Sequence, residues 1–288
     1  MKRKLCCILG VSLASWMVAG NAMAHDEPES LSSYKSNYIV FEGVEEIKFQ
    51  ISFKYQMFGA GGADSLGGMV DAVPLVNLPG KAIADFSRNW YFSYSQKSFW
   101  DIGEPSAPFS DHNFNPSVFY QIETADKSTV WEFSPIEHES NGQDSDMSRS
   151  WNRSYVSASH VSGKWDLYAK GWGIWQRSGN NRDIKDYQGF GEVMVAVNTT
   201  DAVKGERTQD RNMRLELRAR KGLESNNGNI QVDASVPYAC IRKLWSSNEK
   251  KRTFNPHFLL QVFAGEGEKM LAYNEDVLEV RGGLFFHF

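Results

Sequence analysis

Cysteine is scarce in this sequence. Of the three cysteines among 288 residues, Cys6 and Cys7 lie near the amino terminus, and only Cys240 lies in the body of the chain. A single cysteine cannot form an intramolecular disulfide, so a disulfide-stapled fold is excluded for the part of the chain that follows the first two.

Long apolar runs and an excess of positive charge are also missing. After the first residues, no window approaches the ~18 to 20 consecutive apolar residues that a membrane helix needs. The mean hydropathy is -0.45. The chain has 31 Lys plus Arg against 35 Asp plus Glu, a formal charge of -4. This balance argues against a nucleic-acid partner, and the sequence excludes a helical membrane domain.

The amino terminus has the features of a secretory signal peptide. Lys2, Arg3 and Lys4 precede an apolar stretch, and Ala22 to Ala24 form a small-x-small cleavage pattern. We therefore expect residues 1–24 to be a signal peptide and residues 25–288 to form one exported domain.

The dominant period in the exported part is two, which predicts an all-β protein. Apolar and charged residues alternate along 47–55, 213–220 and 230–236. A soluble sandwich with one face in the core would give the same pattern. The last residues favour another fold, because apolar residues alternate from Leu278 to the terminal Phe288, as in the assembly signal of bacterial outer-membrane barrels. Alternating segments of about ten residues are typical of transmembrane barrels.

These segments predict a transmembrane antiparallel β-barrel of about 12 strands. They lie near 37–42, 46–58, 88–100, 113–123, 129–138, 148–159, 163–174, 187–198, 207–220, 229–238, 255–264 and 277–288. If the last strand runs into the periplasm, the outer connections lie near 101–112, 139–147, 175–186, 221–228 and 265–276. The Gly- and Ala-rich segment 59–87 is then an unusually long periplasmic insertion.

One predicted hairpin contains the residues of a hydrolytic site. His138 and Ser140 are two apart, so on an extended chain both side chains project from the same face. Asn152 enters on the neighbouring strand, where it can hold the imidazole ring as the acid of a Ser-His-Asp triad does. Short polar residues in an outer loop could also serve solubility alone. The alternation in 151–158 places Asn152 on the lipid side, however, where polar groups are costly unless they have a function.

The same residues resemble a known family. His138 to Gly142, followed by Ser148 to Arg153, is similar to the active-site signature of outer membrane phospholipase A, and Ser93 to Trp100 also resembles that family. The resemblance implies a calcium-dependent, dimerisation-activated outer-membrane enzyme that hydrolyses acyl esters of phospholipids and lysophospholipids. It implies Ser140 as nucleophile, His138 as general base and acid, and Asn152 as orienter of the histidine.

The resemblance also implies a metal site and a dimer. The oxyanion hole would combine the Gly142 N–H with calcium-bound water. The calcium ligands would be the Gln143 carbonyl, the Ser148 hydroxyl, Asn180 and the Ser106 hydroxyl of the partner subunit. Gln143 replaces the usual Arg of the family, and Asn180 stands where the family has an acidic residue. Gln96, on the presumed lipid face, would hydrogen-bond across the dimer axis, although a place at the membrane interface would also explain it.

Other readings remain open at this point. His112 and His160 are expected in loops or turns, His257 and His287 are expected to face the lumen, and none is expected to pair with a serine. The alternative function is a non-catalytic porin. Charged lumen residues that can pair with one another argue weakly against an open pore; they are Lys48, Lys54, Arg214, Glu216, Arg218, Glu279 and Arg281.

Overall fold

A computed structural model shows an antiparallel barrel in the unit formed by residues 31–288. It describes residues 31–59, 80–202, 213–224, 226–238, 240 and 256–286, so the predicted signal peptide and His287 lie outside the described residues. The strands are β1 (Leu31–Ser33), β2 (Asn37–Glu42), β3 (Glu46–Gln56), β4 (Trp90–Asp101), β5 (Phe109–Glu123), β6 (Thr129–Ser140), β7 (Ser150–Ser162), β8 (Trp165–Arg177), β9 (Gly191–Asn198), β10 (Arg214–Lys221), β11 (Gly228–Pro237), β12 (His257–Gly265) and β13 (Val277–Phe286).

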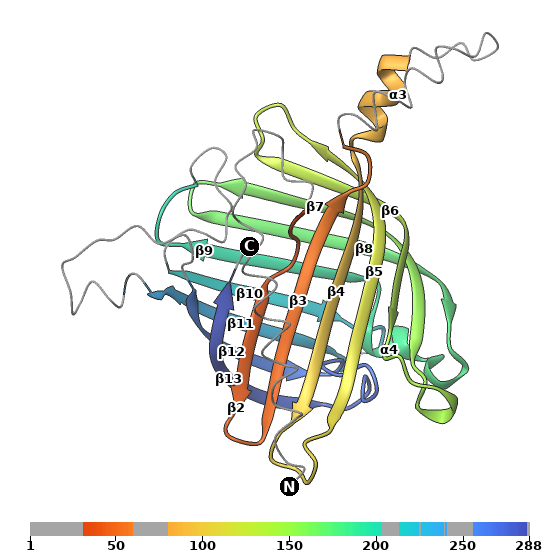
Figure 1. Ribbon diagram of the computed structural model, residues 1–288, viewed down its shortest axis with the longest axis vertical. Helices are drawn as coiled ribbons and strands as arrows, with labels where there is room; N and C mark the ends of the chain where they lie inside the picture. Colours follow the sequence, from red (N-terminus) through yellow and green to blue (C-terminus); the bar gives the residue numbers. More distant parts are fainter. Residues whose placement is uncertain are drawn as a thin grey trace, which may run out of the picture. The chain divides into compact units, whose positions relative to one another are not determined.

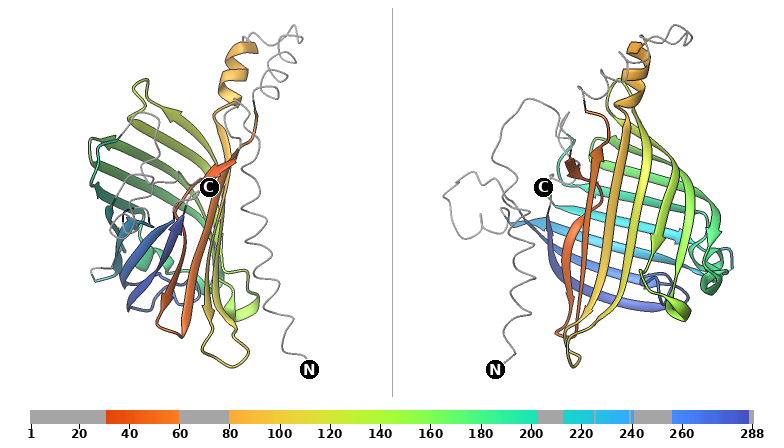
Figure 2. Two further views of the ribbon diagram at one scale, coloured as in Figure 1. Left: turned by 60° about the vertical axis from the view of Figure 1, so that its left-hand side comes forward. Right: turned by 45° about the vertical axis from the view of Figure 1, so that its right-hand side comes forward.

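The sheet closes on itself into 12 strand positions, as the sequence predicts. Each strand from β3 to β13 pairs with its neighbour in the chain, β13 pairs with β2, and β3 pairs with β4. The short β1 and β2 both lie against β3 and together occupy one position. The sheet can be followed around the barrel in Figures 1 and 2.

The two faces of the strands follow the alternation of the sequence. In β7, Trp151, Arg153, Tyr155 and Ser157 are buried inside the barrel, whereas Val156 is exposed outside. Apolar side chains therefore cover much of the outer face, and the inner face is polar. This is the arrangement that a barrel needs in a lipid bilayer.

Helices occur only in connections within the described residues. The helix α3 (Gly80–Ser87) precedes β4, and η2 (Ser145–Met147), η3 (Gly179–Asn181) and α4 (Ile184–Gln188) lie in the connections on either side of β7 and β8. Figure 1 shows α3 at one end of the barrel and α4 at the other. The insertion predicted at 59–87 thus contains a helix in its described part. None of the described helices is long and apolar enough to cross a membrane.

Charged residues inside the barrel pair with one another, as predicted. Lys48, whose side chain is fully buried, contacts Glu268 and donates a hydrogen bond to Gln261 at 2.7 Å. Arg281 forms ion pairs with Glu46 at 2.9 Å and with Glu268 at 2.8 Å. Lys48 and Arg281 therefore lie within a network of carboxylate and amide oxygens that accept their hydrogen bonds.

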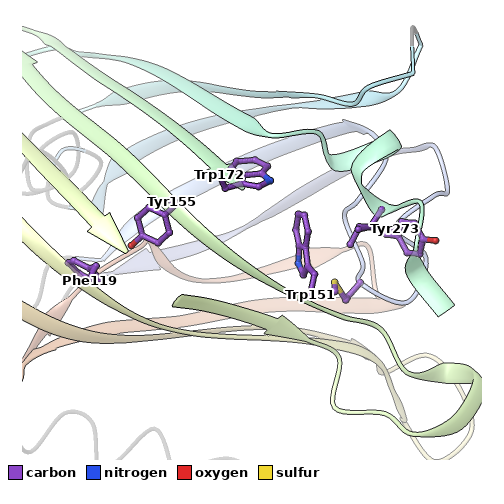
Figure 3. Close-up of a cluster of buried hydrophobic side chains, with 7 residues drawn as sticks. Phe119, Trp151, Tyr155, Trp172 and Tyr273 are labelled. Carbon is purple, nitrogen blue, oxygen red and sulfur yellow. The ribbon is translucent and has the colours of Figure 1, made fainter. Parts of the chain in front are cut away.

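The connection 266–276 folds back into the barrel. Glu268, Met270 and Tyr273 in this segment are buried, and the Met270 N–H donates to Asn113 Oδ1 at 3.1 Å. Figure 3 shows Tyr273 in one aromatic and apolar cluster with Trp151, Trp172, Tyr155 and Phe119. Burial and a hydrogen bond to Asp183 raise the pKa of the Tyr273 phenol. This segment occupies the interior at the end of the barrel that also carries the connections 102–108, 141–149 and 178–190.

Candidate active site

His138 and Asn152 face each other on adjacent strands. They are direct register partners of β6 and β7, and His138 Nδ1 lies 2.7 Å from Asn152 Oδ1. An amide oxygen only accepts hydrogen bonds, so the ring proton must lie on Nδ1. In the neutral ring, the other nitrogen, Nε2, has the lone pair of a general base.

A β-bulge turns this histidine to the outside. Ser134 pairs with Tyr155 and Glu137 pairs with Arg153, so Pro135 and Ile136 together oppose one residue of β7. With unbroken alternation, His138 would share the inner face of Ser134. The extra residue shifts the alternation, and the buried residue is Glu137 instead. Bulges often redirect side chains beside active sites.

Ser140 lies two residues beyond His138 on β6 and shares its outer face. It ends the strand opposite Ser150, and both residues are only partly buried. The chain then turns at Gly142, whose φ is +68°, and a Cβ there would lie 2.7 Å from Phe114 Cε2. Among the described residues, no acceptor takes the Gly142 N–H. The serine hydroxyl and an available backbone donor thus lie within two residues of each other.

Buried charges support the hairpin from the inner face. Arg153 Nη2 lies 3.0 Å from Glu137 Oε2 and 2.8 Å from Glu139 Oε2, and Trp151 Nε1 donates to Glu139 Oε2 at 3.0 Å. Lys170 completes the cluster, 2.7 Å from Glu137 Oε1. These residues alternate with His138 and Asn152 along the two strands. The pairs therefore fix the register that brings the outer residues together.

The residues expected to bind calcium lie in three connections at the same end. Gln143 and Ser148 belong to 141–149, and Asn180 is next to them: its Nδ2 donates to the Ser145 carbonyl at 2.8 Å and to the Ser148 carbonyl at 3.3 Å. Ser106 is exposed in the separate connection 102–108, with φ of 70°. Within one chain, Asn180 therefore contacts the connection that carries Gln143 and Ser148, whereas Ser106 lies in a different connection.

Gln96 lies on the outer face of β4, as expected, within a chain of hydrogen bonds. The Tyr94 hydroxyl donates to Gln96 Oε1 at 2.9 Å, and Gln96 Nε2 donates to Ser98 Oγ at 3.0 Å. Ser98 Oγ lies 2.8 Å from His112 Nδ1. The Gln96 amide thus keeps one further acceptor position on Oε1 and one further donor hydrogen on Nε2 for another partner.

The prediction for two other histidines is wrong. His112 and His160 lie within β5 and β7 rather than in turns. His112 also pairs with a serine, Ser98, contrary to expectation, because the two are register partners of β4 and β5. His257 is buried within the barrel, in agreement with the predicted lumen position.

Three polar residues of the site were not predicted. Asn141, 1% exposed, donates to the Met147 carbonyl at 2.8 Å and accepts from the Arg149 N–H at 2.9 Å, so it closes the 141–149 connection. Asn181 is fully buried and donates to the Ser150 carbonyl at 3.1 Å. Gln176 accepts from Asn152 Nδ2 at 2.8 Å. Asn141 lies inside the quoted signature, whereas nothing in the sequence distinguishes Gln176 from an ordinary residue of an outer connection.

The fold and the site together define a class. The class consists of closed antiparallel barrels that carry on their outer face a serine, a hydrogen-bonded His-Asn pair and a turn with an available backbone N–H. A model of the phospholipase A1 family matches residues 14–286, so the chain belongs to that family.

Individual relatives extend over nearly the whole chain. The phospholipase A1 of Escherichia coli (strain K12) is 24% identical over 297 residues, 94% of this chain and 86% of the relative. The solved outer membrane phospholipase A from Escherichia coli has a TM-score of 0.65 at 21% identity, covering 92% of this chain and 94% of that one. A Salmonella typhi outer membrane phospholipase dimer with bound calcium has a TM-score of 0.66 at 22% identity, with the same coverage. Family membership supports a phospholipase function.

Proposed function

We propose that this protein is an outer-membrane phospholipase that hydrolyses acyl ester bonds of phospholipids and lysophospholipids, at either position of the glycerol, with Ser140 as nucleophile. The observation that carries the proposal is the 2.7 Å contact between His138 Nδ1 and Asn152 Oδ1 on the outer face beside Ser140. The family match supports the reaction class. An active-site mutant of the Escherichia coli enzyme, in which an asparagine is replaced by alanine, supports a role for an asparagine.

The chemistry proceeds by acyl transfer. His138 Nε2 takes the Ser140 Oγ proton as Oγ attacks the ester carbonyl carbon, and the developing imidazolium keeps its Nδ1–H on Asn152 Oδ1. His138 then gives the proton to the leaving alcohol oxygen. A water molecule, deprotonated by the same nitrogen, next cleaves the acyl-serine ester, releasing the fatty acid and Ser140.

The Gly142 N–H is the proposed donor to the tetrahedral oxyanion. Gln143 carbonyl, Ser148 Oγ and Asn180, completed by Ser106 of the partner subunit, would hold calcium. All four supply oxygen, which suits a hard cation, so the donor set fits the ion. When bound, the ion would supply positive charge near the developing oxyanion. None of the four is a carboxylate, so we expect modest affinity, although Asp144 and Asp146 are exposed in the same connection.

Dimerisation is proposed to switch on the hydrolytic activity. Gln96 lies on the outer face among aromatic side chains, and its amide has hydrogen-bonding positions left after its contacts with Tyr94 and Ser98. A second copy placed against this face would use them and remove the amide from lipid. Ser106 of the partner subunit would then complete the metal site. The Salmonella typhi enzyme, solved as a dimer with calcium, supports this arrangement.

The proposed location is the bacterial outer membrane, with the site directed to the outer leaflet. The outer apolar face of the barrel and the outer membrane relatives support it. The location is tested by membrane fractionation together with heat-modifiable gel mobility. A soluble protein that lacks the mobility shift would contradict it.

The decisive experiment measures phosphatidylcholine hydrolysis in detergent micelles. Wild type is compared with Ser140→Ala and Ser154→Ala, each with calcium and with chelator. Ser154 is the matched control, because it lies on the same outer face of β7 and donates to the Pro135 carbonyl rather than contacting His138. We expect activity to vanish in Ser140→Ala and in chelator but to persist in Ser154→Ala. Full activity of Ser140→Ala would refute the nucleophile, and full activity in chelator would refute the calcium requirement.

A further inference from the structure

We propose that Gln176 is a positioning residue that fixes the amide orientation of Asn152; the inference rests on the proposed function of Asn152 as the partner of His138. Gln176 Oε1 accepts a hydrogen bond from Asn152 Nδ2 at 2.8 Å. Asn152 thus contacts His138 through its oxygen and Gln176 through its nitrogen. The three side chains form a continuous line across β6, β7 and β8.

A second bulge places Gln176 in this line. Asn152 pairs with Gln176 and Arg153 pairs with Ile174, so β8 has one residue, Trp175, in excess of β7. With unbroken alternation, Gln176 would share the inner face of Trp172, which is buried. The extra residue returns Gln176 to the outer face, beside Asn152. Both the histidine and the glutamine are therefore presented by a bulge in their own strand.

An asparagine in this position has a weakness that an aspartate lacks. The two ends of its amide are nearly equal in size, but only the oxygen can accept from His138 Nδ1–H. If the amide rotates by half a turn, Nδ2 faces a ring N–H and two donors meet. The ring must then change tautomer, which moves the proton to Nε2 and removes the lone pair that the reaction needs, or rotate, which changes the direction of that lone pair.

The hydrogen-bonding character of the side chain at position 176 determines how strongly rotation of the Asn152 amide is opposed. An acceptor on that side pairs with Nδ2 only when Oδ1 faces the histidine. A donor on that side pairs with Oδ1 only when the amide is reversed. Gln176 acts as the acceptor in this structure, and its amide could serve as either. A side chain that only accepts should therefore favour the active orientation, and one that only donates should favour the inactive one.

The test is a series at position 176 in the full-length protein, with phosphatidylcholine in detergent micelles and saturating calcium. Gln176→Met removes the hydrogen bond but keeps a side chain of similar length. Gln176→Glu introduces a carboxylate that only accepts hydrogen bonds, and Gln176→Lys introduces an ammonium that only donates them. Arg177→Met is the control, because Arg177 pairs in register with Trp151 instead of Asn152. The readouts are kcat on the plateau of the pH profile, KM, and the position of the lower limb of that profile.

We expect kcat to fall about 3- to 10-fold in Gln176→Met, the value of one hydrogen bond, with KM and the pH profile unchanged. Gln176→Glu should keep at least the wild-type plateau, and its negative charge should move the lower limb to higher pH. Gln176→Lys should show the lowest plateau, while Arg177→Met should resemble wild type.

Two results would overturn the inference while the proposed function stands. One is a wild-type plateau in Gln176→Met alongside an inactive Ser140→Ala. The other is an equal loss in the Met, Glu and Lys variants with the normal heat-modifiable mobility, because a structural role does not distinguish donors from acceptors. Activity in Ser140→Ala would instead refute the proposed function and this inference with it.

Discussion

At the scale of single residues, Gly142 combines a backbone conformation and a contact that no other residue type satisfies. Its φ of +68° lies in the left-handed region, and a Cβ would stand 2.7 Å from Phe114 Cε2. We expect Gly142→Ala to displace the proposed oxyanion donor and to lower kcat roughly 100-fold, the usual value of one such donor, with little change in KM.

The control for that change is Gly179→Ala. Gly179 lies in the neighbouring connection, and a Cβ there meets nothing within 4 Å. Steady-state hydrolysis of micellar phosphatidylcholine measures both variants. Wild-type kcat in Gly142→Ala would show that the backbone donor lies elsewhere.

Asn180 supports a prediction about metal affinity. Its amide already contacts the Ser145 and Ser148 carbonyls, so a charge introduced there would lie next to the expected ligands. We expect Asn180→Asp to tighten calcium binding about 10-fold, because a carboxylate attracts the ion more strongly than an amide. Without calcium, the variant should be less stable, since the carboxylate faces two carbonyl oxygens.

Calorimetric titration with calcium, independent of activity, measures this effect. Asn226→Asp adds the same charge at an exposed residue between β10 and β11 and should leave the affinity unchanged. Unchanged affinity in Asn180→Asp would place the cation away from residue 180.

At the scale of elements, alternation predicted the strands, their number and the closed sheet, because each barrel strand has one face toward lipid and one toward the lumen. It could not predict the bulges. In β6, regular alternation from Glu132 and Ser134 would place His138 on the inner face. In the sequence only Pro135 indicates an irregularity, since proline lacks the N–H that a regular ladder of hydrogen bonds needs. The signature residues His138, Ser140 and Asn152 could thus be found by sequence, whereas Gln176 depends on a register shift in β8 that no local motif reveals.

The 141–149 connection depends on one buried side chain. Asn141 bonds the Met147 carbonyl and the Arg149 N–H, and its removal leaves both without their partner, at a cost of about 1 to 3 kcal/mol. We expect Asn141→Leu, which is similar in size, to loosen this connection and lower kcat, while the barrel itself stays folded.

Hydrogen exchange of residues 142–149 and heat-modifiable mobility together test this separation. Asn141→Asp keeps the acceptor for the Arg149 N–H and loses only the donation to Met147, so its exchange should be intermediate. Faster exchange throughout the strands would show instead that Asn141 stabilises the barrel as a whole.

At the scale of the whole molecule, Glu268 couples the returning connection to the barrel wall. Burial alone would raise the pKa of this carboxyl, but the charges of Lys48, Lys97 and Arg281 outweigh it and hold the pKa well below its ordinary value of 4.5. The folded form therefore binds the proton less readily than the unfolded form. The stabilisation is complete above about pH 4.5 and is lost as the pH falls toward the lower folded pKa.

Urea unfolding in lipid vesicles, at pH 7 and pH 3, measures this contribution. Wild type should lose stability at the lower pH. Glu268→Gln, which is neutral throughout, should be less stable at pH 7 by roughly 3 to 5 kcal/mol, because buried cations lose their partner, and should show a smaller pH dependence. An equal pH dependence in both proteins would assign the acid sensitivity to other carboxylates.

The same segment supports a prediction that distinguishes an enzyme from an ion channel. Residues 266–276 enter the barrel, where Met270 and Leu271 donate backbone hydrogen bonds to Asn113 and Asp111 of β5, and Lys48 and Arg281 lie among acceptors. We expect these groups to obstruct the passage of ions. We expect purified wild-type protein to give no steady conductance in planar bilayers, and a variant in which a short Gly-Ser turn replaces 267–275 to conduct. Because His138, Ser140 and Asn152 face outward, the shortened variant should retain measurable hydrolysis. Steady wild-type conductance, together with absent hydrolysis, would favour the porin alternative.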